Sequence, residues 1–222
     1  MPSHDQPGLT PAQSLQRRLR HVFWIGGGSC SGKSTLARRI AERWGLLHYS
    51  TDDVMAEHCR RSTAQACPLL HQFLAMSMDE RWVLRSPEVM LETFHWFQGE
   101  GFPLIVEDLL RIPADQRVLV EGFRLLPELV QPLLLDSNRA VWLLPTPEFR
   151  RATMERRGGA NAGFLAQTSD PERALRNLLG RDEMFTERVA RAVERLGLCG
   201  IPMEAGFSEE AAVEMVARLF GV

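Results

Sequence analysis

The sequence predicts an α/β fold in which helices cover both faces of a parallel sheet. Short apolar runs, rich in β-branched and aromatic residues, alternate with helical patterns along the whole chain, and this alternation is typical of a parallel sheet. The chain has 222 residues, of which 45% are hydrophobic, enough for one buried core without disulfides. We expect a tail with a short helix at residues 1–20 and a single domain at residues 21–222.

The expected elements follow in chain order. "HVFWI" predicts the first buried strand, and the spacing of Leu36, Ile40 and Trp44 predicts a helix that ends at Gly45. Thr146, followed by a proline, is a typical helix start. We expect strands at residues 21–25, 46–50, 117–122, 139–144 and 198–205. We expect helices at residues 10–20, 33–44, 146–157, 169–196 and from 208 onward, with less well defined helical segments at 53–85 and 86–110.

The composition argues against several classes of protein. A formal net charge of −2 disfavours general affinity for nucleic acid or an anionic membrane. The N-terminal segment lacks the apolar core of a secretory signal, and no apolar run is long enough to span a membrane. The four cysteines form no CxxC motif and no pair with histidine at zinc spacing. We expect a cytoplasmic monomer or homodimer that binds a small-molecule acceptor and no nucleic acid.

A glycine-rich segment, "GGSCSGKS", joins the first strand to the following helix. Gly27, Gly32, Lys33 and Ser34 satisfy the pattern G-x-x-x-x-G-K-[ST]. In this pattern backbone amides and the helix dipole bind phosphates, the lysine reaches the β- and γ-phosphates, and the hydroxyl is a Mg²⁺ ligand. Lys33 is the only lysine of the chain, although a GC-rich genome would by itself explain the arginine bias. The predicted nucleotide-binding residues are Gly27, Gly28, Ser29, Cys30 (a small spacer), Ser31, Gly32, Lys33, Ser34 and Thr35.

Acidic residues follow two other predicted strands. Asp52 and Asp53 come directly after residues 46–50, and Glu121 ends the apolar run "RVLVE". Ligands bind at the carboxyl ends of parallel strands, so we predict that Asp52 orients or deprotonates an attacking hydroxyl. Asp53 is either a metal ligand or a cap of the next helix. Glu121 contacts a metal-bound water or the acceptor, unless it is a surface acid. The predicted metal ligands are Ser34, Asp53 and Glu121.

Arginines gather around a glycine-rich break in "FRRATMERRGGANAG". Arg150, Arg151, Arg156 and Arg157 give this segment the composition of a mobile lid, whose guanidiniums can stabilise charge during phosphoryl transfer. The alternative is a solvated arginine face. We predict a lid at about residues 150–190, with catalytic roles for Arg156 and Arg157 beside those of Lys33 and Asp52.

Together these motifs resemble those of the P-loop small-molecule kinases. That group includes shikimate and gluconate kinases, enzymes of the zeta-toxin and chloramphenicol phosphotransferase type, and nucleoside monophosphate kinases. "TDDVM" is similar to the gluconate kinase segment with paired aspartates. The resemblance implies a three-layer P-loop NTPase fold with five parallel strands in the order 2-3-1-4-5. It also implies ATP, Mg²⁺ and an acceptor region at about residues 53–110.

The acceptor itself is not indicated by any motif. "RDEMFTER" at 181–188 is similar to the cytidylate kinase lid pattern RDxxDxxR, but Phe185 replaces the inner aspartate. The aromatic residues between 82 and 97 are typical of core packing rather than of a stacking platform. The predicted acceptor contacts are Asp52, Arg60, Arg85, Arg124 and Arg181, with His58, Arg61, His71 and Arg81 as further candidates.

Three functions fit these patterns. The first is an ATP- and Mg²⁺-dependent transfer of the γ-phosphate to a hydroxyl of a metabolite, nucleoside or antibiotic. The second is a nucleoside monophosphate kinase, which needs more arginines around its acceptor. The third is a nucleotide-dependent regulatory switch with slow hydrolysis. A switch has no evident use for an arginine-rich lid, and the chain lacks the NKxD signature of guanine binding.

Overall fold

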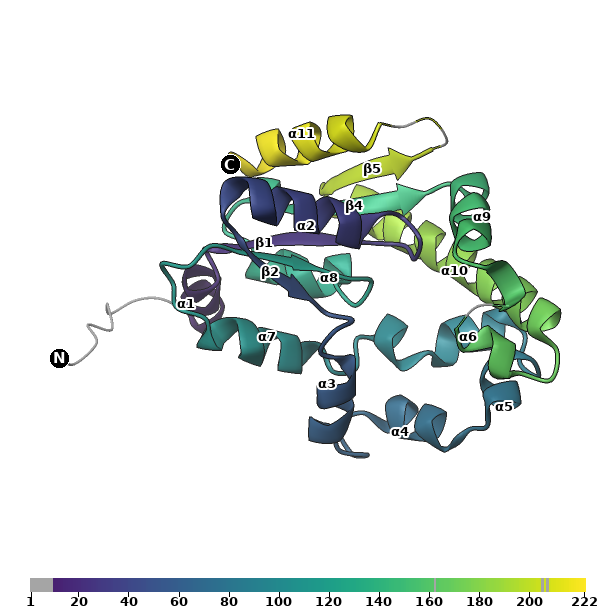
Figure 1. Cartoon of the computed structure of the whole chain (residues 1–222). Coiled ribbons are helices and arrows are strands. Elements are labelled where there is room, and N and C mark those ends of the chain that lie inside the picture. Colours follow the sequence, from purple (N-terminus) through teal and green to yellow (C-terminus); the bar gives the residue numbers. More distant parts are fainter. Residues whose placement is uncertain (1–9, 162, 205, 207) are drawn as a thin grey trace.

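The fold is an α/β arrangement built on a parallel sheet (Figure 1). The computed structural model describes residues 10–161, 163–204, 206 and 208–222, and within these ranges five strands pair in the order β2-β3-β1-β4-β5. Every neighbouring pair is parallel. The predicted class and strand order are therefore confirmed. The strands are β1 (Val22–Gly27), β2 (Leu47–Ser50), β3 (Val118–Glu121), β4 (Ala140–Pro145) and β5 (Cys199–Met203).

Most helices lie where the sequence predicts them. The helix after the glycine-rich segment has the predicted bounds and ends at Gly45, whose left-handed conformation suits glycine. The segment 53–85 divides into three helices, since Ser62 and Met76 adopt extended conformations that end α3 and α4. The α-helices are α1 (Pro11–Arg18), α2 (Lys33–Trp44), α3 (Met55–Arg61), α4 (Pro68–Ala75), α5 (Met78–Trp82), α6 (Pro87–Thr93), α7 (Phe102–Arg111), α8 (Pro127–Val130), α9 (Pro147–Arg156), α10 (Pro171–Arg195) and α11 (Glu209–Phe220).

Alternate residues of each strand point to opposite faces of the sheet, and each face has its own core. Phe23 and Ile25 of β1 pack on the side of α2 and α11. Val22 and Trp24 pack on the opposite side, which includes α10. Figure 1 shows α2 and α11 above the sheet, and α7, α8 and α10 below it. The two hydrophobic faces of each strand account for the nearly continuous apolar runs of the sequence.

Helices α3 to α6 form a separate lobe between β2 and β3 in the chain (Figure 1). This lobe continues into the 3-10 helix η1 (His95–Gln98) and packs against α10, with Phe73, Trp82 and Met90 in the same hydrophobic cluster as Leu178 and Phe185. The lobe therefore lies beyond the sheet edge at which the strands end. No helix within the described ranges is long and apolar enough to cross a membrane.

Candidate functional site

The predicted site residues lie at one edge of the sheet because three parallel strands end there together. Glu121 at the end of β3 is in register with Ile25 of β1 and Ser50 of β2. Backbone hydrogen bonds also hold the residues that directly follow β2 and β3 at this edge. Thr51 N–H donates to the Glu121 carbonyl at 2.9 Å, and Gly122 N–H donates to the Ile25 carbonyl at 3.0 Å. The glycine-rich loop, the "TDD" segment and Glu121 therefore share the carboxyl edge, as the sequence predicts.

The glycine-rich loop folds tightly between β1 and α2. Gly27 has φ of 120°, and a Cβ atom there would lie 2.1 Å from the Leu143 carbonyl oxygen. Only glycine fits at this position. Gly32 has a left-handed conformation, with φ of 85°, and immediately precedes α2. The ammonium of Lys33 turns back over the loop and donates to the Gly28 carbonyl at 2.6 Å and to the Ser31 hydroxyl at 3.3 Å.

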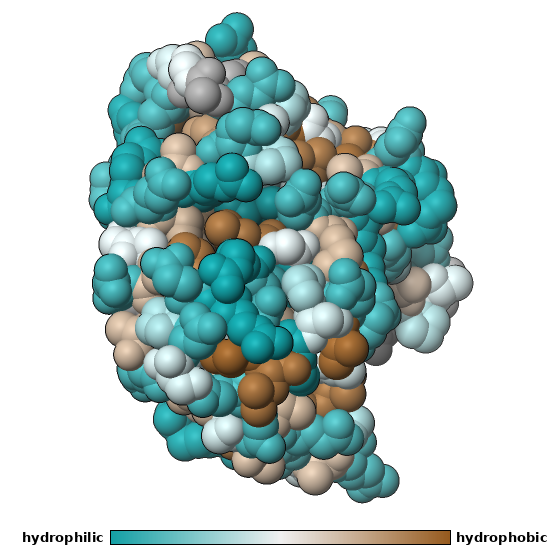
Figure 2. Space-filling model, turned by 90° about the vertical axis from the view of Figure 1, so that its right-hand side faces the viewer, coloured by the Kyte–Doolittle hydropathy of each residue, from teal (hydrophilic) through white to brown (hydrophobic). Residues whose placement is uncertain are grey.

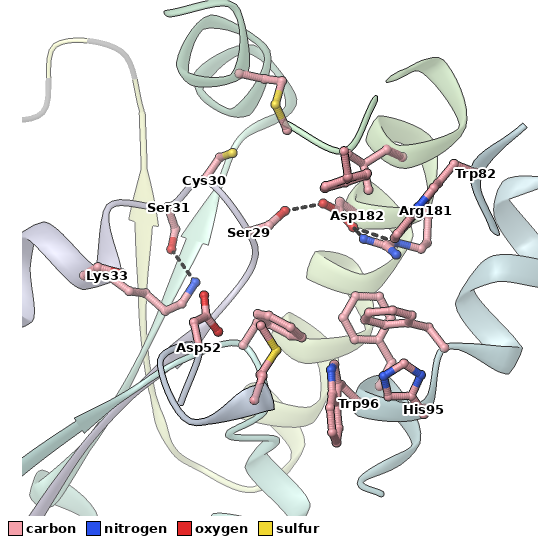
Figure 3. A pocket seen from close by; sticks show the side chains of 18 of the residues that line it. Ser29, Cys30, Ser31, Lys33, Asp52, Trp82, His95, Trp96, Arg181 and Asp182 are labelled. Atoms are coloured by element: carbon pink, nitrogen blue, oxygen red, sulfur yellow. Dashed lines mark hydrogen bonds and ion pairs between the residues drawn. The ribbon is translucent and has the colours of Figure 1, made fainter. Parts of the chain in front are cut away.

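One cavity of about 550 Å³ runs from this loop into the helical lobe. At its loop end it is lined by residues 29–35 and by Asp52, and Figure 3 shows the Asp52 and Lys33 side chains pointing toward one another. At its lobe end the walls are largely aromatic and aliphatic. Figure 2 views the side of the molecule where α9 and α10 lie, and hydrophobic patches interrupt its hydrophilic surface. The structure thus joins the predicted nucleotide loop and the predicted acceptor region in a single space.

Burial changes the acid–base properties of the two charged groups at the loop end. Lys33 is 7% exposed, and burial lowers the pKa of its ammonium, while the carboxylates of Glu121 and Asp52 act in the opposite direction. Asp52 keeps contact with solvent, yet the surrounding protein removes enough hydration to raise the pKa of its carboxyl. The neighbouring Glu121 raises it further, and Lys33 opposes this shift. A raised pKa makes Asp52 a better proton acceptor than an ordinary aspartate.

Glu121 is a buried carboxylate without a hydrogen-bonding partner among the described residues. It is 1% exposed, and both of its carboxylate oxygens lack a hydrogen bond. The nearest basic nitrogen is His48 Nε2, at 3.9 Å from Oε1. Buried carboxylates are normally paired, so these orphaned oxygens suit a cation or its bound water. The prediction of a surface acid at this position is excluded by its burial.

Of the predicted metal ligands, Ser34 lies on the cavity wall, whereas Glu121 is buried beside it and is not part of the lining. Ser34 lines the cavity at the start of α2. Asp53, the third predicted ligand, is exposed and does not line the cavity. Within residues 10–161, 163–204, 206 and 208–222 no cluster of three or more His, Cys, Asp or Glu side chains could hold a metal ion. Hydroxyl and phosphate oxygens would have to complete the coordination.

Asp182 of α10 connects the loop to the opposite wall of the cavity. The hydroxyl of Ser29 donates to Oδ2 of this carboxylate, while Arg181 donates to Oδ1 from Nε at 2.8 Å and from Nη2 at 2.6 Å (Figure 3). Arg181 and Asp182 are 5% and 2% exposed, so this is a buried ion pair. The predicted acceptor contact Arg181 therefore does line the cavity, with its charge already balanced.

The predicted lid arginines separate into different environments. Arg157 lines the cavity and approaches the Cys30 sulfur, with Nη1 to Sγ at 3.8 Å. Arg156 is exposed and hydrogen-bonds to Thr153, so the structure does not bring it to the cavity. Arg150 is 1% exposed and donates to the Thr186 hydroxyl, which makes it a buried link between α9 and α10. Burial also raises the pKa of the Cys30 thiol, in keeping with a spacer rather than a nucleophile.

Most predicted acceptor contacts lie outside the cavity wall. Arg61 pairs with Glu107 and Asp108 of α7, and Arg124 donates to the Thr51 and Gly101 carbonyls. Arg85 bonds to the Thr93 hydroxyl and to a backbone carbonyl. Each of these side chains is held by groups of the protein itself, which is why they do not face the cavity. The predicted contacts that do not line it are Arg60, Arg85 and Arg124, together with the further candidates His58, Arg61, His71 and Arg81.

Aromatic residues supply most of the lobe end of the cavity, and sequence reasoning attributed several of them to the core alone. They do belong to the core, but each also has a face on the cavity. The sequence feature that could have indicated this double role is the dense run "FHWF". Its aromatic residues follow neither helical nor strand spacing, so they cannot all lie on one inner face. The aromatic lining consists of Phe73, Trp82, Phe94, His95, Trp96, Phe97, Phe123 and Phe164.

Comparison with known proteins adds no assignment. No protein-family model matches the chain, and no curated protein sequence matches it. Among solved structures, the crystal structure of an uncharacterized protein from Eubacterium ventriosum ATCC 27560 superposes with a TM-score of 0.45 and 16% identity, over 90% of this chain and 97% of that chain. A likeness at this score and identity carries no inference about family or activity.

Proposed function

We propose that the protein is a P-loop phosphotransferase that moves the γ-phosphate of ATP to a hydroxyl of a small molecule in a Mg²⁺-dependent reaction. The observation that carries the proposal is the single cavity that contains both the glycine-rich loop, with Lys33 and Ser34, and the carboxylate of Asp52. A phosphoryl donor held by the loop and a hydroxyl held in the lobe would meet beside Asp52. Holding two reactants in the right geometry in one cavity is itself a large part of catalysis.

Each of these groups has a chemical task in such a transfer. The Asp52 carboxylate accepts the proton of the acceptor hydroxyl, and its raised pKa suits this task. The hydroxyl oxygen forms a bond to the γ-phosphorus, the bond from that phosphorus to the bridging oxygen breaks, and ADP leaves. Lys33 and Arg157 supply positive charge for the phosphate oxygens.

Ser34 and the orphaned carboxylate of Glu121 would hold the metal, Ser34 directly and Glu121 through water. When bound, magnesium supplies neutralisation of the phosphate charges. Lys33 and the Asp182-linked hydroxyl of Ser29 keep the loop side of the cavity polar, while the aromatic lobe limits access of water to the acceptor.

A nucleoside monophosphate kinase is supported less well. Its acceptor carries a phosphate that needs arginines, but among the described residues the Lys and Arg side chains that line the cavity are Lys33, Arg157 and Arg181. Arg181 is already paired with Asp182. Phe185, where the cytidylate kinase pattern has aspartate, is 1% exposed and packs in the core.

ADP release measured with purified protein, Mg-ATP and a panel of hydroxylated compounds tests the proposal. We expect acceptor-dependent ADP formation that falls about 100-fold or more in Lys33→Met. The matched control is Arg38→Met, which removes an exposed cation of the same helix and should leave the rate within about twofold. ADP formation that is indifferent to every acceptor, with nucleotide retained on the protein, would instead support a regulatory switch.

A further inference from the structure

The lobe end of the cavity is bounded by aromatic rings in mutual contact. The Phe73 ring meets the Trp82 ring edge-on, with centroids 5.6 Å apart, and meets the Phe94 ring edge-on at 5.5 Å. The Phe164 ring lies 4.6 Å from that of Trp82. These rings come from different segments of the chain, so the wall is built by tertiary packing and not by one helix face. Such walls favour flat apolar molecules, which stack or meet ring edges.

The charged groups of the cavity are unevenly distributed. Lys33, Asp52 and Arg157 belong to the loop end, where we place the triphosphate. Toward the lobe, the charged lining residues of the described chain are Arg181 and Asp182, which neutralise each other in a buried pair with Nη2 and Oδ1 at 2.6 Å. The guanidinium also lies 4.5 Å from the centroid of the Phe94 ring. Among the side chains that line the lobe end, the charges therefore balance, while Arg81, Arg85 and Arg124 lie outside the lining and bond to carbonyl and hydroxyl oxygens of the protein.

Two buried polar atoms of residues at this end of the cavity have no hydrogen-bonding partner among the described residues. Arg181 Nη1 and His95 Nδ1 make no hydrogen bond with the described residues, although Arg181 is 5% exposed and His95 is 2% exposed. Both side chains line the cavity, and Figure 3 shows them on the side where Trp82 and Trp96 lie. Burial lowers the pKa of His95 to about 3, so the imidazole is neutral near pH 7. Unpaired buried polar groups of this kind are normally satisfied by a ligand or water.

We infer that the acceptor is an uncharged, flat apolar alcohol: an aromatic or similarly planar body that stacks on Phe73, Trp82 and Phe94, with a neutral oxygen that accepts from Arg181 Nη1. This inference rests on the proposed function, which requires the reacting hydroxyl to reach Asp52 at the other end of the molecule. It names the class of acceptor and excludes two others.

Phosphorylated and carboxylated acceptors are excluded by charge. Among the side chains that line the lobe end, an anion would contact only an arginine whose charge Asp182 already balances, and burial of an anion without a direct partner is strongly unfavourable. Sugars are excluded by hydrogen bonding. A polyhydroxylated molecule would bring several hydroxyls against largely aromatic and aliphatic walls, which offer few hydrogen-bonding partners.

Binding without nucleotide tests this inference independently of catalysis. Isothermal titration calorimetry of the full chain should show saturable binding of 2-naphthalenemethanol, with the negative heat-capacity change of apolar burial. The charged analogue 2-naphthoate has the same rings and should bind at least about tenfold more weakly. Glucose and cytidine monophosphate should give no heat above dilution. Tighter binding of 2-naphthoate, glucose or cytidine monophosphate than of the alcohol would overturn the inference.

A matched pair of variants assigns the binding to this wall. Phe164 lines the cavity and is 40% exposed, so Phe164→Ala removes a ring with little risk to folding. It should raise the dissociation constant of 2-naphthalenemethanol about fivefold or more. Leu135→Ala changes a 54% exposed residue that does not line the cavity and should leave it unchanged. Equal effects of the two substitutions would refute the assignment.

The two proposals can fail separately. If the alcohol binds as expected but no acceptor elicits ADP formation, the acceptor-site inference stands and phosphoryl transfer is wrong. If ATP is consumed with a sugar or a nucleotide acceptor and not with aryl alcohols, transfer stands and the acceptor class is wrong. Lys33→Met keeps these readings distinct, because it should abolish turnover and retain 2-naphthalenemethanol binding.

Discussion

Arg157 Nη1 lies 3.8 Å from the Cys30 sulfur, so the residue after α9 reaches the middle of the glycine-rich loop. Its neighbour Arg156 hydrogen-bonds to Thr153 on the exposed side of the same helix. The sequence predicts equivalent roles for these two arginines, and the structure gives only Arg157 access to the cavity.

Arg157→Ala should therefore reduce kcat, whereas Arg156→Ala should not. Removal of one charged donor from a transferring phosphate typically reduces the rate by about 100-fold, and we expect an effect of this order for Arg157→Ala with a smaller change in KM for ATP. Arg156→Ala is the matched control and should stay within about twofold. Steady-state kinetics with an identified acceptor provide the comparison, and equal losses in both variants would count against this assignment.

Asp52 should control the acidic side of the pH–rate profile. The pKa of this carboxyl is raised above its ordinary 3.8, chiefly because the surrounding protein removes part of its hydration, and the group must be ionised to accept a proton. Activity should fall as the pH drops through this raised value, at a higher pH than an ordinary aspartate would give. Asp52→Asn should remove this acidic limb and lower kcat by about 10²- to 10⁴-fold. Asp53→Asn, at the neighbouring position that does not line the cavity, should preserve both the limb and the rate.

Phe185 of α10 should be a major stabilising residue of the contact between α10 and η1. Its ring lies flat on that of Phe97, with centroids 3.6 Å apart and planes inclined by 5°, and it is 1% exposed. Phe185→Ala should lower the free energy of unfolding by about 3–5 kcal/mol, because it removes buried area and leaves a cavity. Met215→Ala, at a 44% exposed position, should change it by less than about 0.5 kcal/mol. Urea denaturation followed by circular dichroism would measure both.

His95 should make the protein less stable in mild acid. Burial lowers its pKa from 6.5 to about 3, and the charges of Arg124, Arg181, Arg81 and Arg85 act in the same direction. Below pH 6.5 the unfolded chain takes up a proton that the folded protein refuses, so stability falls as the pH is lowered from 6.5 toward 3. Between pH 7.5 and 5.0 this group should account for about 2 kcal/mol.

The variant His95→Phe isolates that contribution. The substitution keeps an aromatic ring at this position and removes the titrating group. When the pH is lowered over the same interval, the unfolding free energy of the variant should therefore fall by about 2 kcal/mol less than that of the wild type. The other histidines titrate alike in the two proteins and cancel in the comparison. Parallel pH dependences of the two proteins would disprove the predicted role.

The sheet and its edge were predictable from the sequence because they depend on local patterns. Apolar runs of five or six residues, a glycine that no other residue can replace at position 27, and acids at strand ends all have short-range causes. The strand order was available only through the family resemblance, since alternation does not specify which strands are neighbours.

The acceptor wall was not predictable for a physical reason. Phe73, Trp82, Phe94 and Phe164 are brought together by the packing of separate helices, and a ring with one face in the core and one on a cavity has the same sequence pattern as a ring that is wholly in the core. Three arginines that the sequence suggested as acceptor contacts do not line the cavity. Arg61, Arg85 and Arg124 find partners within the protein, at carboxylates, hydroxyls and carbonyls that lie far away along the chain or on a neighbouring helix.

The burial of the single lysine has a practical consequence for proteolysis. A lysine-specific endoprotease has one recognition residue in the entire chain, and it is enclosed by the turn that precedes α2. Digestion would yield two fragments and no intermediate products, and its rate would depend on how often that turn opens. The rate at which the two fragments appear would thus report how often the chain opens around Lys33, and a ligand that binds there should slow the cleavage.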